Sequence, residues 1–147
     1  MKKKLMKGPG VRQEMIAVGV KYGEKELQKV SYERWENKHK DPFEVHITLP
    51  EFTCKCPRSG YPDFATFQLN YVPDKWVIEL KTIKLYINSF RDRYLSHENS
   101  TNEIFDTLWK SLNPRYMELI GDFNPRGNVH TIVRREKTKR GFRGKLQ

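Results

Sequence analysis

Residues 64–75 read Phe-Ala-Thr-Phe-Gln-Leu-Asn-Tyr-Val-Pro-Asp-Lys, and this stretch decides the fold class. Its first part, residues 64–72, has the pattern of a β-strand, and the Pro-Asp-Lys that follows is typical of a turn. Residues 76–87 then predict a second, long strand that returns beside the first. The two strands together form a β-hairpin, which indicates an antiparallel sheet.

The segment before this hairpin adds another strand. Residues 43–49 alternate between apolar and polar side chains, as in a strand with one buried face, and Pro50 ends the strand. A loop follows over residues 51–62, which contain both cysteines, two prolines and a glycine.

The segment after the hairpin has a helical pattern. Apolar residues recur at four-residue spacing over residues 104–112, with a cap expected at Ser96 or Ser100 and a stop at Asn113-Pro114. Two last strands are predicted around residues 117–119 and 129–133. The order of strand, hairpin, helix and hairpin predicts an α+β domain rather than a doubly wound parallel sheet.

The net charge of +10 belongs to the two ends of the chain. Residues 1–10 carry four lysines and no acid, and residues 134–147 carry seven basic residues against one acid. The remaining residues, 11–133, hold 17 basic and 17 acidic side chains and are neutral. Basic ends of this kind favour solubility or weak, salt-sensitive attraction to polyanions, and no motif of alternating aromatic and basic residues accompanies them.

Composition divides the chain of 147 residues into three parts. We expect a polar N-terminal arm over residues 1–40, a single catalytic domain over residues 41–136 and a basic C-terminal tail over residues 137–147. Two cysteines cannot form a disulfide framework, so a reducing cytoplasm is the expected location. The sequence contains no apolar stretch long enough to cross a membrane, and its basic start lacks the apolar region of a signal peptide.

Cys56 is the first candidate for chemistry. It lies in a polar loop next to Lys55 and Arg58, and cationic neighbours favour the thiolate form of a cysteine. The prolines and glycine between Cys56 and Asp63 would bring the carboxyl group back toward the sulfur. A thiolate with a nearby acid is the minimum for nucleophilic attack with proton delivery. A metal site is not expected, because the four histidines show no ligand spacing relative to the Cys-Lys-Cys pair.

Three motifs in order reveal a family resemblance. Residues 52–65, Phe-Thr-Cys-Lys-Cys-Pro-Arg-Ser-Gly-Tyr-Pro-Asp-Phe-Ala, closely resemble the active-site segment of the NADPH-dependent 7-cyano-7-deazaguanine reductases, the QueF-type nitrile reductases. Residues 79–86, Glu-Leu-Lys-Thr-Ile-Lys-Leu-Tyr, resemble the second motif of this family, and residues 97–99 and 124–127 also match. The resemblance covers the chain from about residue 42 to residue 136.

The resemblance implies a tunnelling fold (T-fold), in which an antiparallel sheet carries helices packed on one side and several subunits close an oligomeric barrel. The short, single-domain form of the family is typically a decamer of two stacked pentamers with active sites between subunits. The implied activity is the four-electron reduction of the nitrile of free 7-cyano-7-deazaguanine to 7-aminomethyl-7-deazaguanine, with two NADPH per turnover. This reaction belongs to queuosine biosynthesis, a tRNA modification pathway, and needs neither a nucleic acid nor a membrane.

The resemblance also implies roles for individual residues. Cys56 would add to the nitrile carbon to give a thioimide, while Asp63 and His97 take part in proton transfer. The remaining roles are substrate binding by Ile78, Glu79, Leu80, His97 and Glu98, and NADPH binding by Lys81, Lys84 and Arg126. On a strand, Lys81 and Lys84 would lie on opposite faces, so contact of both with one cofactor would require a bulge or a cofactor bound between subunits.

Two other functions are open at this point. Archaeal relatives use ammonia to convert a nitrile already inserted in tRNA to an amidine (archaeosine type), although they lack the Glu-Leu-Lys type of motif at residues 79–81. A non-catalytic nucleic-acid-binding protein is the second alternative, because of the net charge. Without the resemblance, these acidic residues also have ordinary structural interpretations. Glu79 and Lys81 could form an ion pair on the surface, and Glu98 could reflect the preference for acidic residues at the start of a helix.

Overall fold

The computed structural model describes residues 32–144; the predicted arm up to residue 31 and residues 145–147 lie outside the described part. The secondary-structure elements follow one another along the chain as β1 (Arg34–Glu36), β2 (Val45–Lys55), β3 (Pro62–Val72), β4 (Trp76–Ile78), α3 (Leu80–Asn88), α4 (His97–Leu112), β5 (Tyr116–Arg126) and β6 (Val129–Thr138).

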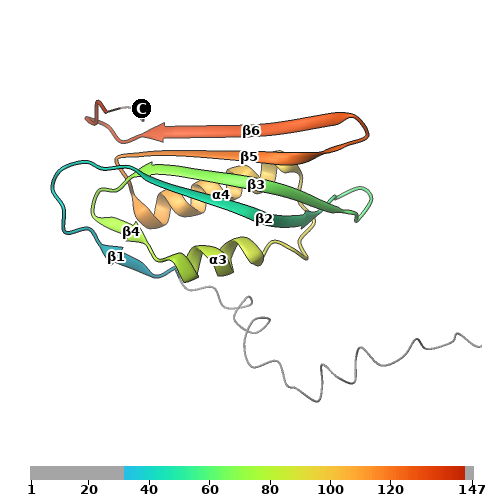
Figure 1. Ribbon diagram of the computed structural model, residues 1–147, viewed down its shortest axis with the longest axis horizontal. Helices are drawn as coiled ribbons and strands as arrows, with labels where there is room; N and C mark the ends of the chain where they lie inside the picture. Colours follow the sequence, from blue (N-terminus) through green and yellow to red (C-terminus); the bar gives the residue numbers. More distant parts are fainter. Residues whose placement is uncertain (1–31, 145–147) are drawn as a thin grey trace, which may run out of the picture.

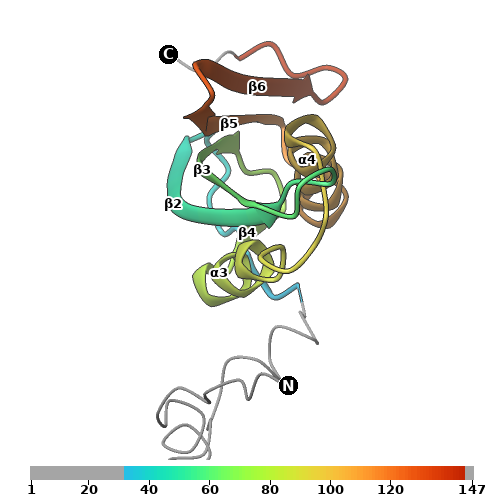
Figure 2. The ribbon, with the colours of Figure 1, turned by 90° about the vertical axis from the view of Figure 1, so that its right-hand side faces the viewer.

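A four-stranded antiparallel sheet forms the body of the structure. Its strand order is β2-β3-β5-β6, while β1 and β4 form a separate antiparallel pair. Helices α3 and α4 lie on one side of the large sheet, where α4 packs against β5 and β6 and α3 packs against β2 (Figures 1 and 2). The α+β class with helices on one side of an antiparallel sheet is therefore confirmed.

The core lies between this sheet and the two helices. Alternate residues of β3 and β5 point into the core, as the period of a strand with one buried face requires. Aromatic rings fill its centre, and the fully buried ones are Phe52, Phe67, Tyr71, Phe90, Phe105 and Phe123. Edge-to-face contacts join several of these rings, so the sheet beneath the helices is tightly fixed.

The long strand predicted over residues 76–87 is wrong, and so is its hairpin with residues 64–72, because β4 pairs with β1 and not with β3. Only Trp76–Ile78 is a strand, and a helix follows from Leu80 to Asn88. The Glu79 carboxylate caps the helix, because it accepts hydrogen bonds from the backbone N–H groups of Lys81 (2.9 Å) and Thr82 (2.7 Å). The buried face of the helix consists of Thr82, Ile83, Tyr86 and Ile87. Spacings of three and four residues are typical of one face of a helix, but in this short segment they resemble the alternation of apolar and polar residues in a strand.

The predicted cap of the second helix is confirmed at Ser96. Its hydroxyl accepts a hydrogen bond from the N–H of Asn99 (3.1 Å), and α4 ends at Asn113, which adopts the left-handed conformation. Gly121 of β5 lies under the start of this helix. A Cβ atom there would lie 2.8 Å from both the Thr101 hydroxyl and the Phe67 ring, so only glycine permits this approach of helix and sheet.

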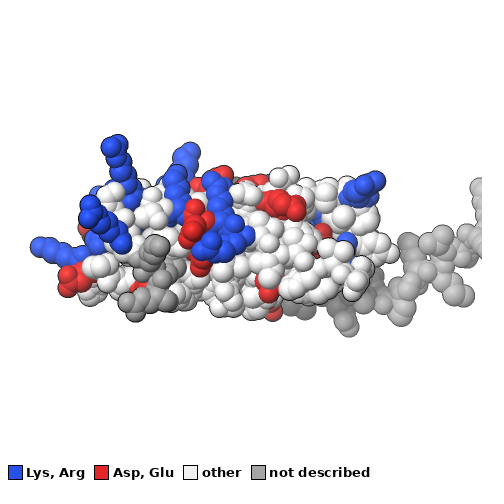
Figure 3. Space-filling view, turned by 90° about the horizontal axis from the view of Figure 1, so that it is seen from above, with Lys and Arg blue, Asp and Glu red and all other residues white. Residues whose placement is uncertain are grey.

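The C-terminal basic residues from Arg134 to Lys139 are part of the domain surface. Arg134 pairs with Glu118, Arg135 with Asp106 at 2.8 Å, and Lys139 with Asp74 at 2.6 Å. The view onto β6 accordingly shows Lys and Arg interspersed with acidic side chains (Figure 3). The domain limits at residues 41 and 136 stay a prediction, but β1 pairs with β4 before the first limit, and β6 runs past the second to Thr138.

Neither helix in the described part of the chain, residues 32–144, has the length and hydropathy that a membrane crossing requires.

Candidate active site

Cys56 lies at the tip of the hairpin formed by β2 and β3. Its N–H donates to the carbonyl of Tyr61 (2.8 Å), and its carbonyl accepts from the N–H of Gly60 (2.9 Å). Gly60 has a φ of +72°, a left-handed conformation that glycine adopts without strain. These bonds close a short loop over residues 57–60 and fix the backbone that carries the sulfur.

The loop stabilises the ionised form of this sulfur. The pKa of the Cys56 thiol is lowered, chiefly by a hydrogen bond from the Ser59 hydroxyl and then by bonds from the backbone N–H groups of Ser59 and Arg58. The sequence pointed instead to the cationic side chains nearby. Lys55, however, pairs with Asp92 at 3.3 Å and lies over the ring of Tyr94. The thiolate is therefore held mainly by neutral donors of its own loop.

Cys54 has the opposite environment. It is fully buried, and its thiol lies 3.7 Å from the carbonyl oxygen of Leu95. Burial raises the pKa of this thiol to about 11. Of the two cysteines, only Cys56 is therefore suited to act as a nucleophile near neutral pH.

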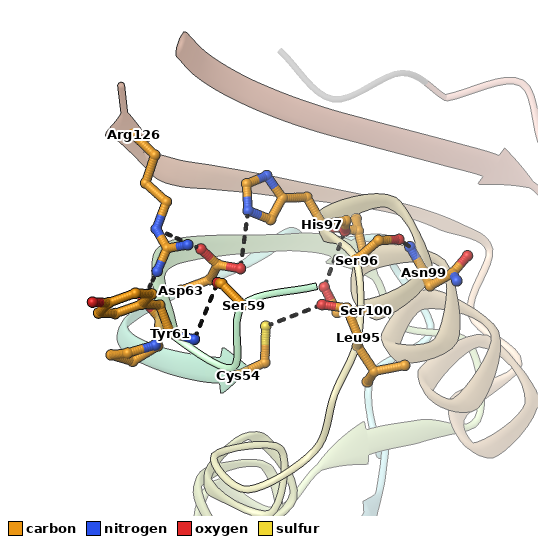
Figure 4. A network of polar contacts seen from close by, with 12 residues as sticks. Cys54, Ser59, Tyr61, Asp63, Leu95, Ser96, His97, Asn99, Ser100 and Arg126 are labelled. Carbon is orange, nitrogen blue, oxygen red and sulfur yellow. Dashed lines mark hydrogen bonds and ion pairs between the residues drawn. The ribbon is translucent and has the colours of Figure 1, made fainter. Parts of the chain in front are cut away.

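Asp63 lies at the start of β3, opposite Cys54 in the strand register, and is 5% exposed. Its Oδ1 is 3.0 Å from Nε of Arg126, and its Oδ2 is 3.5 Å from Nε2 of His97 (Figure 4). Arg126 also donates from Nη2 to the carbonyl of Pro62 (2.7 Å). The last residue of β5 and the first residue of α4 thus converge on one buried carboxylate.

His97 is held in place by both its ring and its backbone. Its imidazole stacks on Phe123 with a centroid distance of 4.0 Å. Its carbonyl accepts from the hydroxyls of Ser100 (3.0 Å) and Thr101 (2.9 Å). The next residue, Glu98, is exposed in the first turn of α4. The structure therefore brings Cys56, Asp63, His97 and Glu98 to one end of the sheet.

The other residues predicted to bind the substrate, Ile78, Glu79 and Leu80, lie elsewhere in the structure. Ile78 is buried, and its N–H donates to the Tyr71 hydroxyl (3.1 Å). Glu79 caps α3, and Leu80 is 65% exposed at the first position of this helix. The start of α3 lies beside β4, away from the hairpin tip between β2 and β3 (Figure 1). One chain does not bring this set next to Cys56.

The helix changes the relation between the two lysines expected to bind the cofactor. Lys81 and Lys84 are three residues apart on α3, so they share a side of the helix, and both are exposed. Lys84 also borders a pocket of about 180 Å³ between α3 and β2, lined by Leu49, Pro50, Glu51, Lys84, Ile87 and Asn88. The bulge that a strand would have required is unnecessary.

Sequence reasoning missed two residues of the site and placed a third differently. Ser59 follows the Cys-Pro-Arg segment, where a serine before glycine is a recognisable turn signal. Phe123 left no local signal, because its contact with His97 depends on the packing of α4 on β5. Arg126 was assigned to the cofactor, but in the structure it pairs with Asp63. Among residues 32–144, no group of three potential metal ligands occurs.

The known proteins that are similar to this chain point to one family. Residues 62–141 match the family model described as QueF-like protein. The NADPH-dependent 7-cyano-7-deazaguanine reductase of a Nitratiruptor species is 64% identical over 118 residues, which cover 78% of this chain and 90% of the relative. The enzyme of the same name from Aquifex aeolicus is 56% identical over 121 residues, 82% of this chain and 94% of the relative.

A solved structure confirms the fold. The crystal structure of the archaeosine synthase QueF-Like in the apo form superposes with a TM-score of 0.61 at 23% identity, covering 66% of this chain and 95% of that one. The similarity in sequence to the reductases is much greater than to this synthase. The chain belongs to the family of NADPH-dependent 7-cyano-7-deazaguanine reductases.

Proposed function

We propose that this protein reduces the nitrile of 7-cyano-7-deazaguanine to an aminomethyl group with NADPH, and that Cys56 is the nucleophile. The observation that carries the proposal is the thiolate-stabilising loop around Cys56 at the same end of the sheet as the buried Asp63. The names of the most similar relatives support the substrate and the cofactor. A reaction on a free base before its insertion into tRNA requires no RNA, and a reducing cytoplasm suits two free cysteines.

The first step uses only residues of this chain. The Cys56 thiolate forms a bond to the nitrile carbon, and one π-electron pair of the nitrile moves to nitrogen. The nitrogen takes a proton, which gives a thioimide. Asp63 is the donor we assign, with His97 positioned to supply the carboxyl group with a proton across their 3.5 Å contact. Protonation of Asp63 removes the negative charge from its contact with Arg126, so the ion pair is weakened to a neutral hydrogen bond in this state.

NADPH would supply the chemistry that this chain lacks, namely two hydrides. Together with the proton taken in the first step and one more, they convert the nitrile carbon to an aminomethyl group, while the bond between carbon and the Cys56 sulfur breaks and the thiolate is released. Lys81 and Lys84 would hold its phosphates, since they form two exposed positive charges on one side of α3. Arg126 would reach a phosphate only after leaving Asp63. We therefore assign the phosphates first to the two lysines.

Substrate recognition would use residues of two subunits. Glu98 is exposed beside His97, and its carboxylate can accept hydrogen bonds from the ring N–H and amino groups of a guanine-like base. Glu79 and the neighbouring backbone of Ile78 and Leu80 lie at the start of α3, away from the hairpin tip that carries Cys56, so they would act in a neighbour's site. Two further observations support a homo-oligomer. Strands β2 and β6 are the edges of the four-stranded sheet, and the pocket beside Lys84 is too small for a dinucleotide.

The intact mass of the protein after mixing with 7-cyano-7-deazaguanine in the absence of NADPH tests the nucleophile. We expect an increase equal to the mass of the nitrile, and Cys56→Ala should abolish it. Cys54→Ala is the matched control and should still form the adduct, because Cys54 is buried. Adduct formation that survives Cys56→Ala would overturn the covalent mechanism. Oxidation of NADPH only in the presence of the free base, without ammonia or RNA, would separate the reductase from the archaeosine-type alternative.

A further inference from the structure

Helix α3 packs against β2, and a pocket of about 180 Å³ lies between them (Figures 1 and 2 show the two elements side by side). Three of the residues that line the pocket are apolar, namely Leu49, Pro50 and Ile87. The other three bring polar groups of three kinds, a carboxylate from Glu51, an ammonium from Lys84 and an amide from Asn88. Apolar walls with a few polar groups of mixed chemistry suit a flat heterocycle better than a simple ion.

A bulge in β2 forms one wall of this pocket. The register between β2 and β3 shifts between Leu49 and Phe52, which places Pro50 and Glu51 outside the regular ladder. Strand β2 is an edge of the four-stranded sheet, and Pro50 has no N–H to offer a further strand. An added strand could therefore not pair continuously past the pocket, so this part of the edge is available to a ligand.

We propose that this pocket binds the adenine ring of NADPH and that Lys84 at its rim binds the 2′-phosphate, the group that distinguishes NADPH from NADH. The inference rests on the proposed reduction by NADPH and assigns a subsite for one half of that cofactor, since the pocket is too small for both halves. The Asn88 amide matches adenine, because it can accept a hydrogen bond from the amino group and donate one to the adjacent ring nitrogen. The Glu51 carboxylate can accept the second proton of the same amino group.

The carboxylate in the lining also decides where the phosphate lies. Glu51 would repel a phosphate inside the pocket, so the pocket itself takes the uncharged ring. Lys84 lines the pocket but is exposed, so its ammonium can reach a phosphate outside. Lys81, Lys84 and Asn88 share one side of α3, at spacings of three and four residues. Lys81 then lies one turn nearer the start of the helix, where it can bind the pyrophosphate of the same cofactor.

The position of the pocket excludes the nicotinamide ring as its occupant. The nicotinamide must contact the carbon of the nitrile, either at Cys56 of the same chain or beside Glu79, which we assign to a neighbour's site. Along β2, Glu51 and Cys56 are five residues apart, roughly 16 Å at the rise of a strand. Along α3, Asn88 is nine residues from Glu79, roughly 13 Å at the rise of a helix. Both separations require that the ring in the pocket is the adenine, at the far end of the cofactor.

The test is isothermal titration calorimetry of the full-length protein, without the nitrile, against 2′,5′-ADP and 5′-AMP. The first ligand contains the adenine and the 2′-phosphate of NADPH, and the second lacks the 2′-phosphate. We expect 2′,5′-ADP to bind roughly tenfold more tightly, and Lys84→Ala should remove this difference. Asn88→Leu should weaken the binding of both ligands roughly tenfold, because the bonds to the adenine are lost. Asn88→Asp keeps the size of the side chain and should do the same, because a carboxylate cannot donate to the ring nitrogen.

Lys110→Ala is the matched control, because it removes a lysine from the other helix, α4. It should leave both affinities and their ratio unchanged. The proposal is overturned if the unsubstituted protein does not bind 2′,5′-ADP or does not prefer it to 5′-AMP, if both Asn88 variants bind like the unsubstituted protein, or if Lys110→Ala acts like Lys84→Ala. The nitrile adduct of Cys56 forms without NADPH, so its presence in these variants would show that only the adenine subsite has failed and not the proposed function.

Discussion

The imidazole of His97 lies flat against the ring of Phe123, with centroids 4.0 Å apart and planes inclined by 11°. Phe123 is fully buried and packs edge-to-face against Phe67 and Phe52. The plane of the imidazole is therefore set by the hydrophobic core, while Nε2 at its edge faces Asp63. A catalytic ring fixed in this way loses little freedom when a substrate binds.

Phe123→Leu should lower kcat roughly tenfold, because it removes the surface against which His97 is held. The free energy of unfolding should fall by about 1–2 kcal/mol. Phe105→Leu is the control, since Phe105 is equally buried in α4 but stacks on Trp109 rather than on His97. Steady-state kinetics and urea unfolding of both variants provide the comparison. An equal loss of kcat in the control would mean that the stack has no special role.

Asp63→Asn should reduce kcat by roughly 10²- to 10⁴-fold, because an amide cannot deliver a proton to the nitrile nitrogen. Asp122→Asn is the control in the same sheet, where an exposed aspartate pairs with His130 at 2.5 Å. This variant should keep nearly full activity. The rate of NADPH oxidation measures both. Full activity in Asp63→Asn would remove this residue from the proton path.

Lys84→Ala should raise the KM for NADPH roughly tenfold with a small effect on kcat, because a charged hydrogen bond to a phosphate is lost. Lys81→Ala should act in the same direction, since the two residues share one side of α3. Lys110→Ala removes a lysine from the last turn of α4 and should leave the KM unchanged. Similar effects of all three substitutions would indicate general attraction by net charge.

Gly121→Ala should destabilise the protein by about 1–3 kcal/mol, because its Cβ would overlap the Phe67 ring and the Thr101 hydroxyl. Thermal or urea unfolding measures this loss. In the double variant with Thr101→Ala one of these contacts is relieved, so the total loss should be smaller than the sum of the two single losses. Strict additivity would show that helix α4 does not press on this strand.

His46 should make stability depend on pH. Its Nδ1 faces Oδ1 of Asn70 at 2.8 Å, and Nε2 faces the Glu44 carboxylate at 2.9 Å. Asn70 uses its NH₂ group to bond Glu118, so both partners of the ring accept, and only a doubly protonated imidazole satisfies them. These hydrogen bonds, first that to Asn70, raise the pKa of His46 above its usual value of 6.5.

The pKa of His46 is higher in the folded protein than in the unfolded chain, where it is near 6.5. The protonated imidazole therefore stabilises the fold fully at pH values below 6.5, and this stabilisation disappears as the pH rises through the pKa of the folded protein. His46→Gln should therefore cost stability at acidic pH and progressively less at alkaline pH. Because His46 is largely exposed, the effect should be small. Urea unfolding of the two proteins across this range measures it, and a difference that grows with pH would contradict the assignment.

Local patterns in the sequence predicted most of the sheet and the cap of α4. The strands predicted over residues 43–49 and 64–72 and the cap at Ser96 depend on neighbouring residues, and the structure has them as β2, β3 and the start of α4. The end predicted at Pro50 and the loop predicted from residue 51 are wrong, because β2 runs on to Lys55 with a shift of register between Leu49 and Phe52. The helix at residues 80–88 was missed because its first residues also alternate, and because the capping role of Glu79 becomes visible only with the backbone.

The partners of the site could not be predicted in the same way. Cys56 and Asp63 were named from the residues of their loop and His97 from the order of motifs, but the contacts of Asp63 with Arg126 and His97 join three separate elements. Such contacts follow from the way in which β3, β5 and α4 pack together. The periodicity of apolar residues within one segment gives no information about this packing. Arg126 was assigned to the cofactor through the family resemblance and its charge, and its pairing with a buried carboxylate had no signal in the sequence.

The strand order also bears on how the site forms. Hairpins β2–β3 and β5–β6 each join neighbours in sequence, whereas β3 meets β5 only across the segment that holds β4 and both helices. Closing this long loop is the entropically costly event, so we expect it to limit the folding rate. Cys56 and Asp63 belong to the first hairpin, while Phe123 and Arg126 belong to the second. The catalytic geometry would thus arise late, when the two hairpins dock.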